Sequence, residues 1–512
     1  MIRVPAETAG LLPTAWRHCV GTGRTELALR RDYVDSLKLV QREIGFRHIR
    51  GHGLFGDSMG VVRPYEHQGT RRLHHSFTYV DQIIDAYLEL GIRPFLELGF
   101  MPEELASGSQ TVFWWKGNVT PPRSHPEWAD LVRATLTHLI DRYGLDEVRT
   151  WPIEVWNEPN LDLFWENADE KAYHHLYEVT AHAVKGVDAS LQVGGPAISP
   201  GADEWLPRFT DFTDQRDVPL DFVSRHAYTS GPAQRVPFTS YQTLAPARGL
   251  LDQFATPRRQ LKGTRYAELP VHITEFNSSY CPDNPIHDTA FNAAYLAPVL
   301  AEGGELADSF SYWTFSDMFE EAGVPTALFH GGFGLVTHRQ VKKPTFHLYA
   351  FMSRMGEDLL SRGDHHLVTR HRDGRVTVLA WAPVDPTGET PGPDRHEVHL
   401  SIPLAGTETP GTGTAGAEAF VRRSTVDEDH GNAYTAWREM GSPRSPKQGR
   451  LDMLHEAAEP ARTHFRLPLE EGRADLRLTL ARNEITLVEL APLVDETSEW
   501  WDERRLLGRE TP

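Results

Sequence analysis

The sequence predicts a (β/α)8 barrel followed by a β-sandwich. Three observations support this fold class: eight short apolar runs in the first two thirds of the chain, helical patterns between them, and a change to short strand-like runs after about residue 346. A barrel of this kind takes about 250 residues or more, and the chain has 512. We therefore expect a barrel over residues 1–345 and a sandwich with its closing helix over residues 346–512.

Several of the eight runs are continuously apolar, which is typical of parallel strands buried on both faces. The runs are Arg17–Gly21, Phe46–Arg50, Pro94–Gly99, Ile153–Asn157, Gln192–Ile198, Phe222–Tyr228, Val271–Phe276 and Phe310–Phe315. Helical periodicity is clearest in Tyr33–Ile44, Tyr79–Leu90, Trp128–Tyr143, Lys171–Val187 and Thr289–Leu300. This alternation indicates βαβ units, and an open doubly wound sheet is the alternative arrangement.

The last third of the chain predicts a small antiparallel domain. Phe346–Leu360 has the pattern of a helix that closes the barrel. Short strand-like runs separated by turn-forming residues follow it, as in a sandwich. They are His366–His371, Arg375–Ala382, His396–Leu400, Ala461–Leu467, Ala474–Leu480 and Glu484–Leu490.

Charge and cysteine content exclude several classes of function. The chain has 52 Lys and Arg against 71 Asp and Glu, a net charge of −19, which disfavours nucleic-acid and anionic membrane partners. Two cysteines, Cys19 and Cys281, form no metal or redox motif, and free thiols are favoured over a bridge between them. We find neither a signal-peptide pattern nor an apolar run long enough to span a membrane, so a cytoplasmic location is expected.

Two glutamates stand where a barrel places catalytic groups. Glu158 follows the fourth predicted strand and Glu275 lies near the end of the seventh. Residues at the carboxyl ends of barrel strands line the mouth of the site, and the fourth and seventh strands lie nearly opposite each other. A glutamate at such a position can also cap a helix or pair with an arginine. Two of them facing each other predict glycosidic cleavage, in which one carboxyl protonates the leaving oxygen and the other attacks or activates water.

At these residues the chain resembles a known family. Trp156–Asn160 together with Thr274–Asn277 resembles the retaining glycoside hydrolases of clan A, and more narrowly glycoside hydrolase family 39, the β-xylosidases. Further stretches are similar through most of the barrel and, more loosely, in the later domain. They are Phe46–Gly53, Trp115–Pro122, Ser278–Tyr280, Asn284–Thr289, Tyr312–Glu321, Val426–Asn432 and Trp437–Met440.

The resemblance implies a role for each matched residue. Glu158 would be the acid/base, Glu275 the nucleophile, and Asn157 the partner of the sugar 2-hydroxyl. Arg50 is expected to lie against the nucleophile and lower its pKa. Of the adjacent Glu320 and Glu321, one is expected to contact the sugar, and we choose Glu320. The other sugar-binding residues implied are His52, His226, Tyr228 and Trp313.

The implied function is a retaining, exo-acting β-xylosidase that acts on xylo-oligosaccharides. Retention predicts that the two carboxyls lie about 5–5.5 Å apart. Another clan A activity, such as an α-L-iduronidase or arabinosidase, and a non-catalytic sugar-binding protein are the alternatives. No metal or cofactor is expected: Gly51–Gly56 matches a dinucleotide-binding pattern, but neither a helix start nor an acidic residue follows at the required spacing. The resemblance also implies a homo-oligomer in some relatives.

Overall fold

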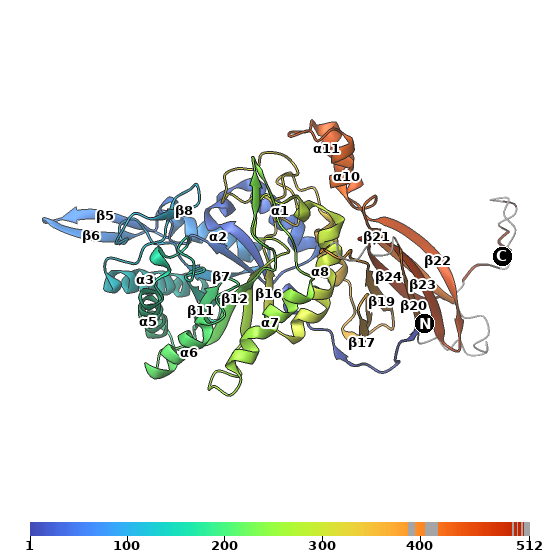
Figure 1. Cartoon of the computed structure of the whole chain (residues 1–512), viewed down its shortest axis with the longest axis horizontal. Helices are drawn as coiled ribbons and strands as arrows, with labels where there is room; N and C mark the ends of the chain where they lie inside the picture. The colour runs from blue at the N-terminus through green and yellow to red at the C-terminus, as the bar shows by residue number, and fades with distance from the viewer. Residues whose placement is uncertain (388–394, 405–417, 494–495, 499, 503–504, 506–512) are drawn as a thin grey trace.

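The computed structural model describes residues 1–387, 395–404, 418–493, 496–498, 500–502 and 505. Figure 1 shows a barrel and a strand-rich domain arranged side by side along the long axis of the molecule. Both predicted units are therefore present, and the barrel confirms the predicted fold class over the open doubly wound sheet.

The barrel is closed by eight parallel strands. Their order around the ring is β10-β11-β12-β15-β16-β3-β4-β7, so sequential barrel strands are neighbours and the last pairs with the first. The strands are β3 (Cys19–Arg24), β4 (His48–His52), β7 (Arg93–Leu98), β10 (Pro152–Val155), β11 (Gln192–Ile198), β12 (Phe222–Ala227), β15 (Val271–Phe276) and β16 (Ser309–Tyr312).

Nearly every residue of these strands is buried, which explains why several of the runs are continuously apolar rather than alternating. The helices outside the ring are amphipathic instead: α1 buries Tyr33, Leu37 and Val40, which lie on one face at helical spacing. The helices of this part are α1 (Arg31–Glu43), α2 (Thr78–Glu89), α3 (His125–Tyr143), α4 (Leu145–Val148), α5 (Glu170–Val187), α6 (Trp205–Gln215), α7 (Arg248–Leu261), α8 (Ala290–Glu302) and α9 (Pro344–Met352).

Three small hairpins interrupt the βα connections. The hairpin of β5 (Val62–His67) and β6 (Thr70–His75) projects from the end of the molecule that is remote from the strand-rich domain (Figure 1). The other two are β8 (Thr111–Val112) with β9 (Gly117–Asn118), and β13 (Gln234–Val236) with β14 (Thr239–Tyr241). All three follow the carboxyl end of a barrel strand, which is the face that carries active sites in this fold.

The second domain contains a ten-stranded sheet with the strand order β1-β20-β23-β22-β21-β24-β19-β18-β17-β2. Side chains from both halves of this order share one apolar core, so the halves pack face to face like a sandwich. The strands are β1 (Ile2–Arg3), β2 (Gly10–Leu11), β17 (Asp358–Gly363), β18 (His366–Arg370), β19 (Val376–Trp381), β20 (Arg395–Pro403), β21 (Glu418–Val426), β22 (Ala461–Glu470), β23 (Arg473–Ala481) and β24 (Ile485–Leu493).

Two expectations for this domain need correction. The closing helix α9 ends at Met352, and Asp358–Gly363 forms strand β17 instead of continuing the helix. Gly356 lies so close to the backbone of Arg370 that a Cβ there would be 2.4 Å from the Arg370 carbonyl carbon, and the chain turns into the sheet at this point. Strand β21 was also missing from the predicted strands, because Arg422 and Arg423 interrupt its apolar alternation.

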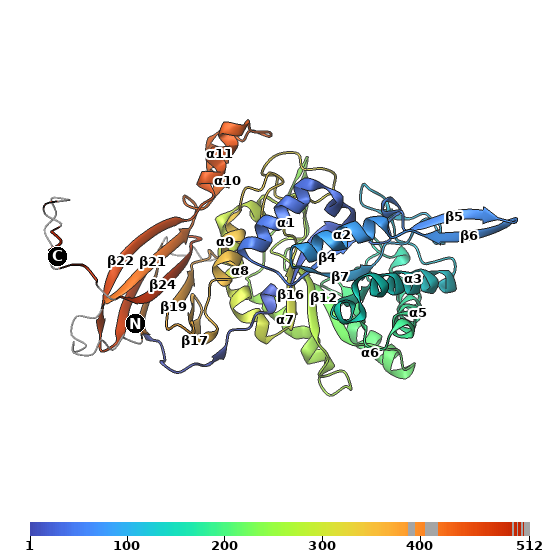
Figure 2. The ribbon, with the colours of Figure 1, turned by 180° about the vertical axis from the view of Figure 1, so that it is seen from behind.

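The first residues of the chain pair with the second domain and not with the barrel. Ile2 and Arg3 run parallel to β20, and Gly10 and Leu11 pair with β17. The barrel itself begins at β3. We expected the barrel unit to start at residue 1, but in their sheet pairing β1 and β2 belong to the second domain. Figure 2 shows α8 and α9 beside the strand-rich domain, and the large apolar core includes side chains of α9 together with Trp381 and Ile485 of that domain.

A helical arm from the second domain reaches the barrel. Helices α10 (Ala433–Glu439) and α11 (Gln448–Ala457) lie between β21 and β22 in the sequence. Their Trp437 and Leu454 share an apolar cluster with Leu328 and Phe329 from the loop that follows β16. Both cysteines are buried and free. Within the described residues, no helix is long and apolar enough to cross a membrane.

Candidate active site

The structure brings Glu158 and Glu275 together at the carboxyl ends of β10 and β15. One carboxylate oxygen of each lies within 4.8 Å of the other and of a ring nitrogen of His226. The Nδ1 atom of His226 is 2.8 Å from Glu158 Oε1 and 3.5 Å from Glu275 Oε2. This separation matches the short distance of retaining glycosidases, since inverting enzymes keep the two groups about 6.5–9.5 Å apart to admit a water.

The backbone at Glu158 adopts a conformation that side chains rarely take. Its φ is 41°, and Trp156 two residues earlier has a φ of 72°. Hydrogen bonds hold this turn: the Glu158 amide donates to the Ala197 carbonyl at 3.0 Å, and the Trp156 indole donates to the Phe164 carbonyl at 2.7 Å. Such strain persists only where surrounding structure enforces it, and here it directs the Glu158 side chain toward Glu275.

The environment assigns different protonation states to the two glutamates. Burial, reinforced by the nearby charge of Glu275, raises the pKa of Glu158 well above its usual range. Burial also raises the pKa of Glu275, but Arg50 and His52 oppose that shift. Arg50 lies against Glu275 and lowers its pKa as expected, but desolvation outweighs this effect and the net shift is upward. The pKa of Glu158 is nevertheless the more strongly raised of the two. Glu275 therefore ionises first and can act as the nucleophile, while Glu158 keeps its proton and can act as the acid.

Arg50 is the centre of a fully buried charge network. Its guanidinium donates to Glu154 Oε2 at 2.6 Å, to Glu275 Oε1 at 2.8 Å and to Asn157 Oδ1 at 3.0 Å. The bond to Asn157 fixes the orientation of the amide, so the Asn157 NH2 group remains to donate to a substrate hydroxyl. One arginine thus orients both the nucleophile and the predicted partner of the sugar 2-hydroxyl.

Glu97 of β7 completes the network, although the sequence analysis did not predict it. Its Oε2 forms an ion pair with Arg50 Nη2 at 2.9 Å and lies 2.7 Å from His52 Nδ1. His52 Nε2 then lies 3.6 Å from Glu275 Oε1 and 3.6 Å from Glu321 Oε1. Glu97 therefore fixes the ring of His52 so that its other nitrogen is presented between two carboxylates of the pocket.

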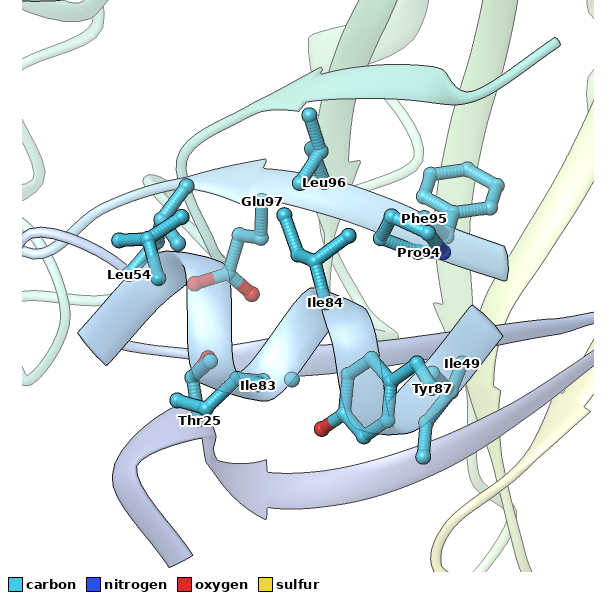
Figure 3. Close-up of a pocket in the computed structure, with 12 residues that line it drawn as sticks. Thr25, Ile49, Leu54, Ile83, Ile84, Tyr87, Pro94, Phe95, Leu96 and Glu97 are labelled. Carbon is cyan, nitrogen blue, oxygen red and sulfur yellow. The ribbon is translucent and has the colours of Figure 1, made fainter. Parts of the chain in front are cut away.

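Glu97 also borders a small apolar cavity between α2 and the barrel strands (Figure 3). The cavity has a volume of about 20 Å³, which is too small for a sugar. Figure 3 shows the Glu97 carboxylate directed between Leu54 and Ile84. Glu97 does not line the substrate pocket, so it acts on substrate through His52 and Arg50.

We expect Glu97→Gln to lower kcat/KM by about 10- to 100-fold, because a charge-assisted bond to His52 and one to Arg50 are both weakened. Initial rates on an aryl glycoside measure the effect, and the thermal unfolding midpoint shows whether the variant is folded. Glu104→Gln removes an exposed glutamate that bonds Arg71 and serves as the matched control. Activity of Glu97→Gln equal to that of the control would show that Glu97 positions nothing.

The remaining predicted sugar-binding residues, apart from His226 and Glu320, line one pocket of about 510 Å³. Tyr228 donates to Glu275 Oε2 at 3.1 Å. Trp313 packs at the base of the pocket at 4.9 Å from the His52 ring, and a Cβ at Gly21 would lie 2.3 Å from the indole, so only glycine leaves room for it. The pocket contains Glu158 and Glu275 together with His52, Asn157, Tyr228 and Trp313, while His226 lies behind them and contacts both carboxylates.

The structure places Glu320 outside the pocket. Both of its carboxylate oxygens are occupied, by Arg24 at 2.7 Å and Arg30 at 2.6 Å. The adjacent Glu321 lines the pocket instead. Burial and the charges of Glu275 and Glu158 raise the pKa of Glu321 well above its usual range. Adjacent residues of a loop point to opposite sides, and the sequence alone offered no signal to tell them apart.

The only three-residue group with metal-ligand spacing among the described residues is Glu158, His226 and Glu275. All three are already engaged with one another, with Arg50 or with Tyr228. Two opposed carboxyls with different proton affinities, in a pocket of sugar size, can cleave a glycosidic bond without a further group.

Comparison with known proteins settles the family. The model of the family "Glycosyl hydrolases family 39" matches residues 1–474. The chain belongs to glycosyl hydrolase family 39. It is 49% identical over 503 residues to a β-xylosidase of Geobacillus stearothermophilus, covering 98% of this chain and 97% of that protein. It is 37% identical over 465 residues to a β-xylosidase of Caldicellulosiruptor saccharolyticus, covering 88% and 89%.

Solved family 39 structures share the whole architecture. A crystal structure of a monomeric β-xylosidase from Caulobacter crescentus aligns with a TM-score of 0.85 at 33% identity, covering 96% of this chain and 99% of that one. A more distant relative is an α-L-iduronidase of Mus musculus, 22% identical over 493 residues, covering 87% of this chain and 72% of that protein. The implied homo-oligomer stays a prediction for this chain.

Proposed function

We propose that this family 39 protein is a retaining, exo-acting β-xylosidase that releases terminal xylose from xylo-oligosaccharides. The observation that carries the proposal is the pair of opposed carboxyls, Glu158 and Glu275, with oxygens within 4.8 Å of each other. The names of the two long, well-aligned relatives support xylose as the glycone.

The proposed reaction has two displacements. In the first, the Glu275 carboxylate attacks the anomeric carbon while Glu158 protonates the departing oxygen, which leaves a glycosyl ester on Glu275. The ester carries no negative charge, so one cause of the raised pKa of Glu158 disappears. Glu158 then accepts a proton from water, the water oxygen bonds to the anomeric carbon, and Glu275 departs with the configuration retained.

The proposed glycone contacts come from the side of the ring formed by β16, β3 and β4. His52, Trp313 and Glu321 meet there, beside the nucleophile. In this arrangement Asn157 donates to the 2-hydroxyl, and His52 and Glu321 meet the remaining hydroxyls. Glu320 takes a structural role in place of the sugar contact that we assigned to it.

The wall behind the glycone end supports exo action. Arg24 binds Glu320 at 2.7 Å and stacks over Trp114 and Trp115 at 5.4 and 5.8 Å, and the Trp114 amide donates to the Glu321 carbonyl. These contacts tie the loop after β7 to the loop after β16. A pocket closed at that end accepts one sugar unit, and a tight fit around xylose excludes the additional C6 group of glucose.

We expect single xylose units to be released from xylobiose and xylotriose, with xylobiose as the other early product from xylotriose, little action on polymeric xylan, and glucosides cleaved about 10-fold or more slowly than xylosides. Chromatography of early time points and a panel of 4-nitrophenyl glycosides measure both properties. Mixed oligosaccharides released from xylan without xylose would instead indicate an open cleft.

The two alternatives fit the site less well. An iduronidase needs a basic group against the carboxylate of its glycone, whereas the described pocket residues at the glycone end include Glu275 and Glu321 and no lysine or arginine. A non-catalytic sugar-binding protein would not need an acid and a nucleophile held in different protonation states. The same glycoside panel separates these alternatives, because an iduronidase would turn over only the iduronide and a binding protein none.

A further inference from the structure

The aglycone side of the pocket is defined by the position of the proton donor. The leaving oxygen must face Glu158 on β10, and the glycone contacts lie on the side of β16, β3 and β4. The aglycone therefore extends over the opposite side of the ring, above β10, β11 and β12. The residues that line the pocket on this side follow those strands or lie on the segment after β15.

This side has a mostly apolar lining that is open to solvent. Leu161, Leu163 and Phe164 follow Glu158 directly, and Tyr280 faces them from the segment after β15. Leu163 is 58% exposed and Tyr280 43% exposed, which is unusual for large apolar side chains at a pocket rim. They provide surfaces on which a sugar or aromatic ring can pack.

Arg235 is the only lysine or arginine among the described residues that line the pocket. It lies on the β13–β14 hairpin, where its backbone partner across the hairpin is Ser240. Directly opposed residues project from the same face of a hairpin, and Ser240 is fully buried, so Arg235 lies on the inward face. Phe238 at the tip of the hairpin is 76% exposed, so the tip is open to solvent.

The hairpin is held in place although Arg235 itself is exposed. The Ser240 amide donates to the Asp283 carbonyl at 3.1 Å, and the Gln242 side chain donates to the Gly231 carbonyl at 2.6 Å. Within the described residues, the guanidinium of Arg235 makes no ion pair or hydrogen bond, although Asp283 lies in the same neighbourhood around Cys281. A fixed hairpin thus presents an unpaired guanidinium to a pocket that contains three carboxyl groups and no other lysine or arginine among the described residues.

We infer that Arg235 selects substrates whose aglycone carries a carboxylate. This inference rests on the proposed function and deepens it by naming the class of aglycone. A guanidinium binds a carboxylate through two parallel hydrogen bonds, and here the apolar lining would hold the ring that bears it. The chain has a net charge of −19, so a local cation is what allows an anionic substrate to approach this pocket.

Two kinds of xyloside carry such a group, and paired substrates distinguish them. The first pair is xylobiose and xylobiose with a uronic acid attached to its reducing-end xylose. The second is 4-nitrophenyl xyloside and the same compound with a ring carboxylate. For each pair, kcat/KM is measured with the wild-type protein and with Arg235→Gln, and the ratio of acidic to neutral substrate is compared. Differences in leaving-group reactivity cancel in that comparison.

We expect Arg235→Gln to lower the acidic-to-neutral ratio by about 3- to 10-fold in at least one pair, and added salt to reduce the effect. The affected pair identifies the source of the carboxylate. Arg72→Gln, on the remote β5–β6 hairpin, makes the same charge change and should leave both ratios unaltered. Unchanged ratios in both pairs with Arg235→Gln overturn the inference. Failure of the wild-type protein to cleave the neutral substrates would overturn the proposed function instead.

Discussion

Replacing Glu275 with alanine is expected to lower turnover of 4-nitrophenyl xyloside by about 10⁴-fold or more, because the covalent route has no nucleophile. Arg50 at 2.8 Å and Tyr228 at 3.1 Å hold the two oxygens of Glu275 in position for attack, and the alanine variant offers no carboxylate at that position. Release of 4-nitrophenol measures the loss. Glu268→Ala, which removes an exposed glutamate just before the same strand, is the matched control.

Azide provides the stereochemical part of this test. The alanine variant leaves a space on the face of the sugar opposite the leaving group, and azide can enter it and attack the anomeric carbon. The expected product is therefore the α-xylosyl azide, with inverted configuration, identified by NMR. A variant that retains more than about 1% of wild-type turnover, or that forms the β-azide, would disprove the assignment of Glu275 as nucleophile.

The barrel and its two carboxyls could be predicted because they depend on local patterns. Strands buried on both faces are continuously apolar, and Glu158 and Glu275 stand where such runs end. Position in the ring then places them opposite each other. The aromatic and histidine contacts came from the family resemblance, and the structure brings nearly all of them to the same pocket.

The parts of the site that could not be predicted depend on contacts between segments that are distant in the sequence. Glu97 lies within a buried strand, and nothing in its neighbours reveals that Arg50 and His52 supply its partners. The choice between Glu320 and Glu321 depends on Arg24 and Arg30, which lie almost 300 positions earlier in the chain. The net upward shift of the Glu275 pKa is a similar case: the effect of Arg50 could be predicted, but not the degree of burial that outweighs it.

Replacing Glu158 with alanine should give a loss that depends on the leaving group. With xylobiose, whose leaving alcohol needs a proton, kcat/KM is expected to fall by about 10²- to 10⁴-fold. With 2,4-dinitrophenyl xyloside, kcat/KM should change little, because that phenolate leaves without protonation. Its kcat should still fall, since the second displacement lacks a base and the glycosyl ester accumulates.

The pH profile and azide complete the test of Glu158. In the wild-type protein, kcat/KM for xylobiose should decline as pH rises through the raised pKa of Glu158, because only the protonated form donates. The alanine variant should lose this basic limb, and azide, which enters on the face of the leaving group, should give the β-xylosyl azide. Glu204→Ala, which removes a glutamate that is 91% exposed, should match the wild type throughout. Equal losses of kcat/KM on xylobiose and on the dinitrophenyl substrate would mean that Glu158 is not the acid, because a proton donor matters only in proportion to the need of its leaving group.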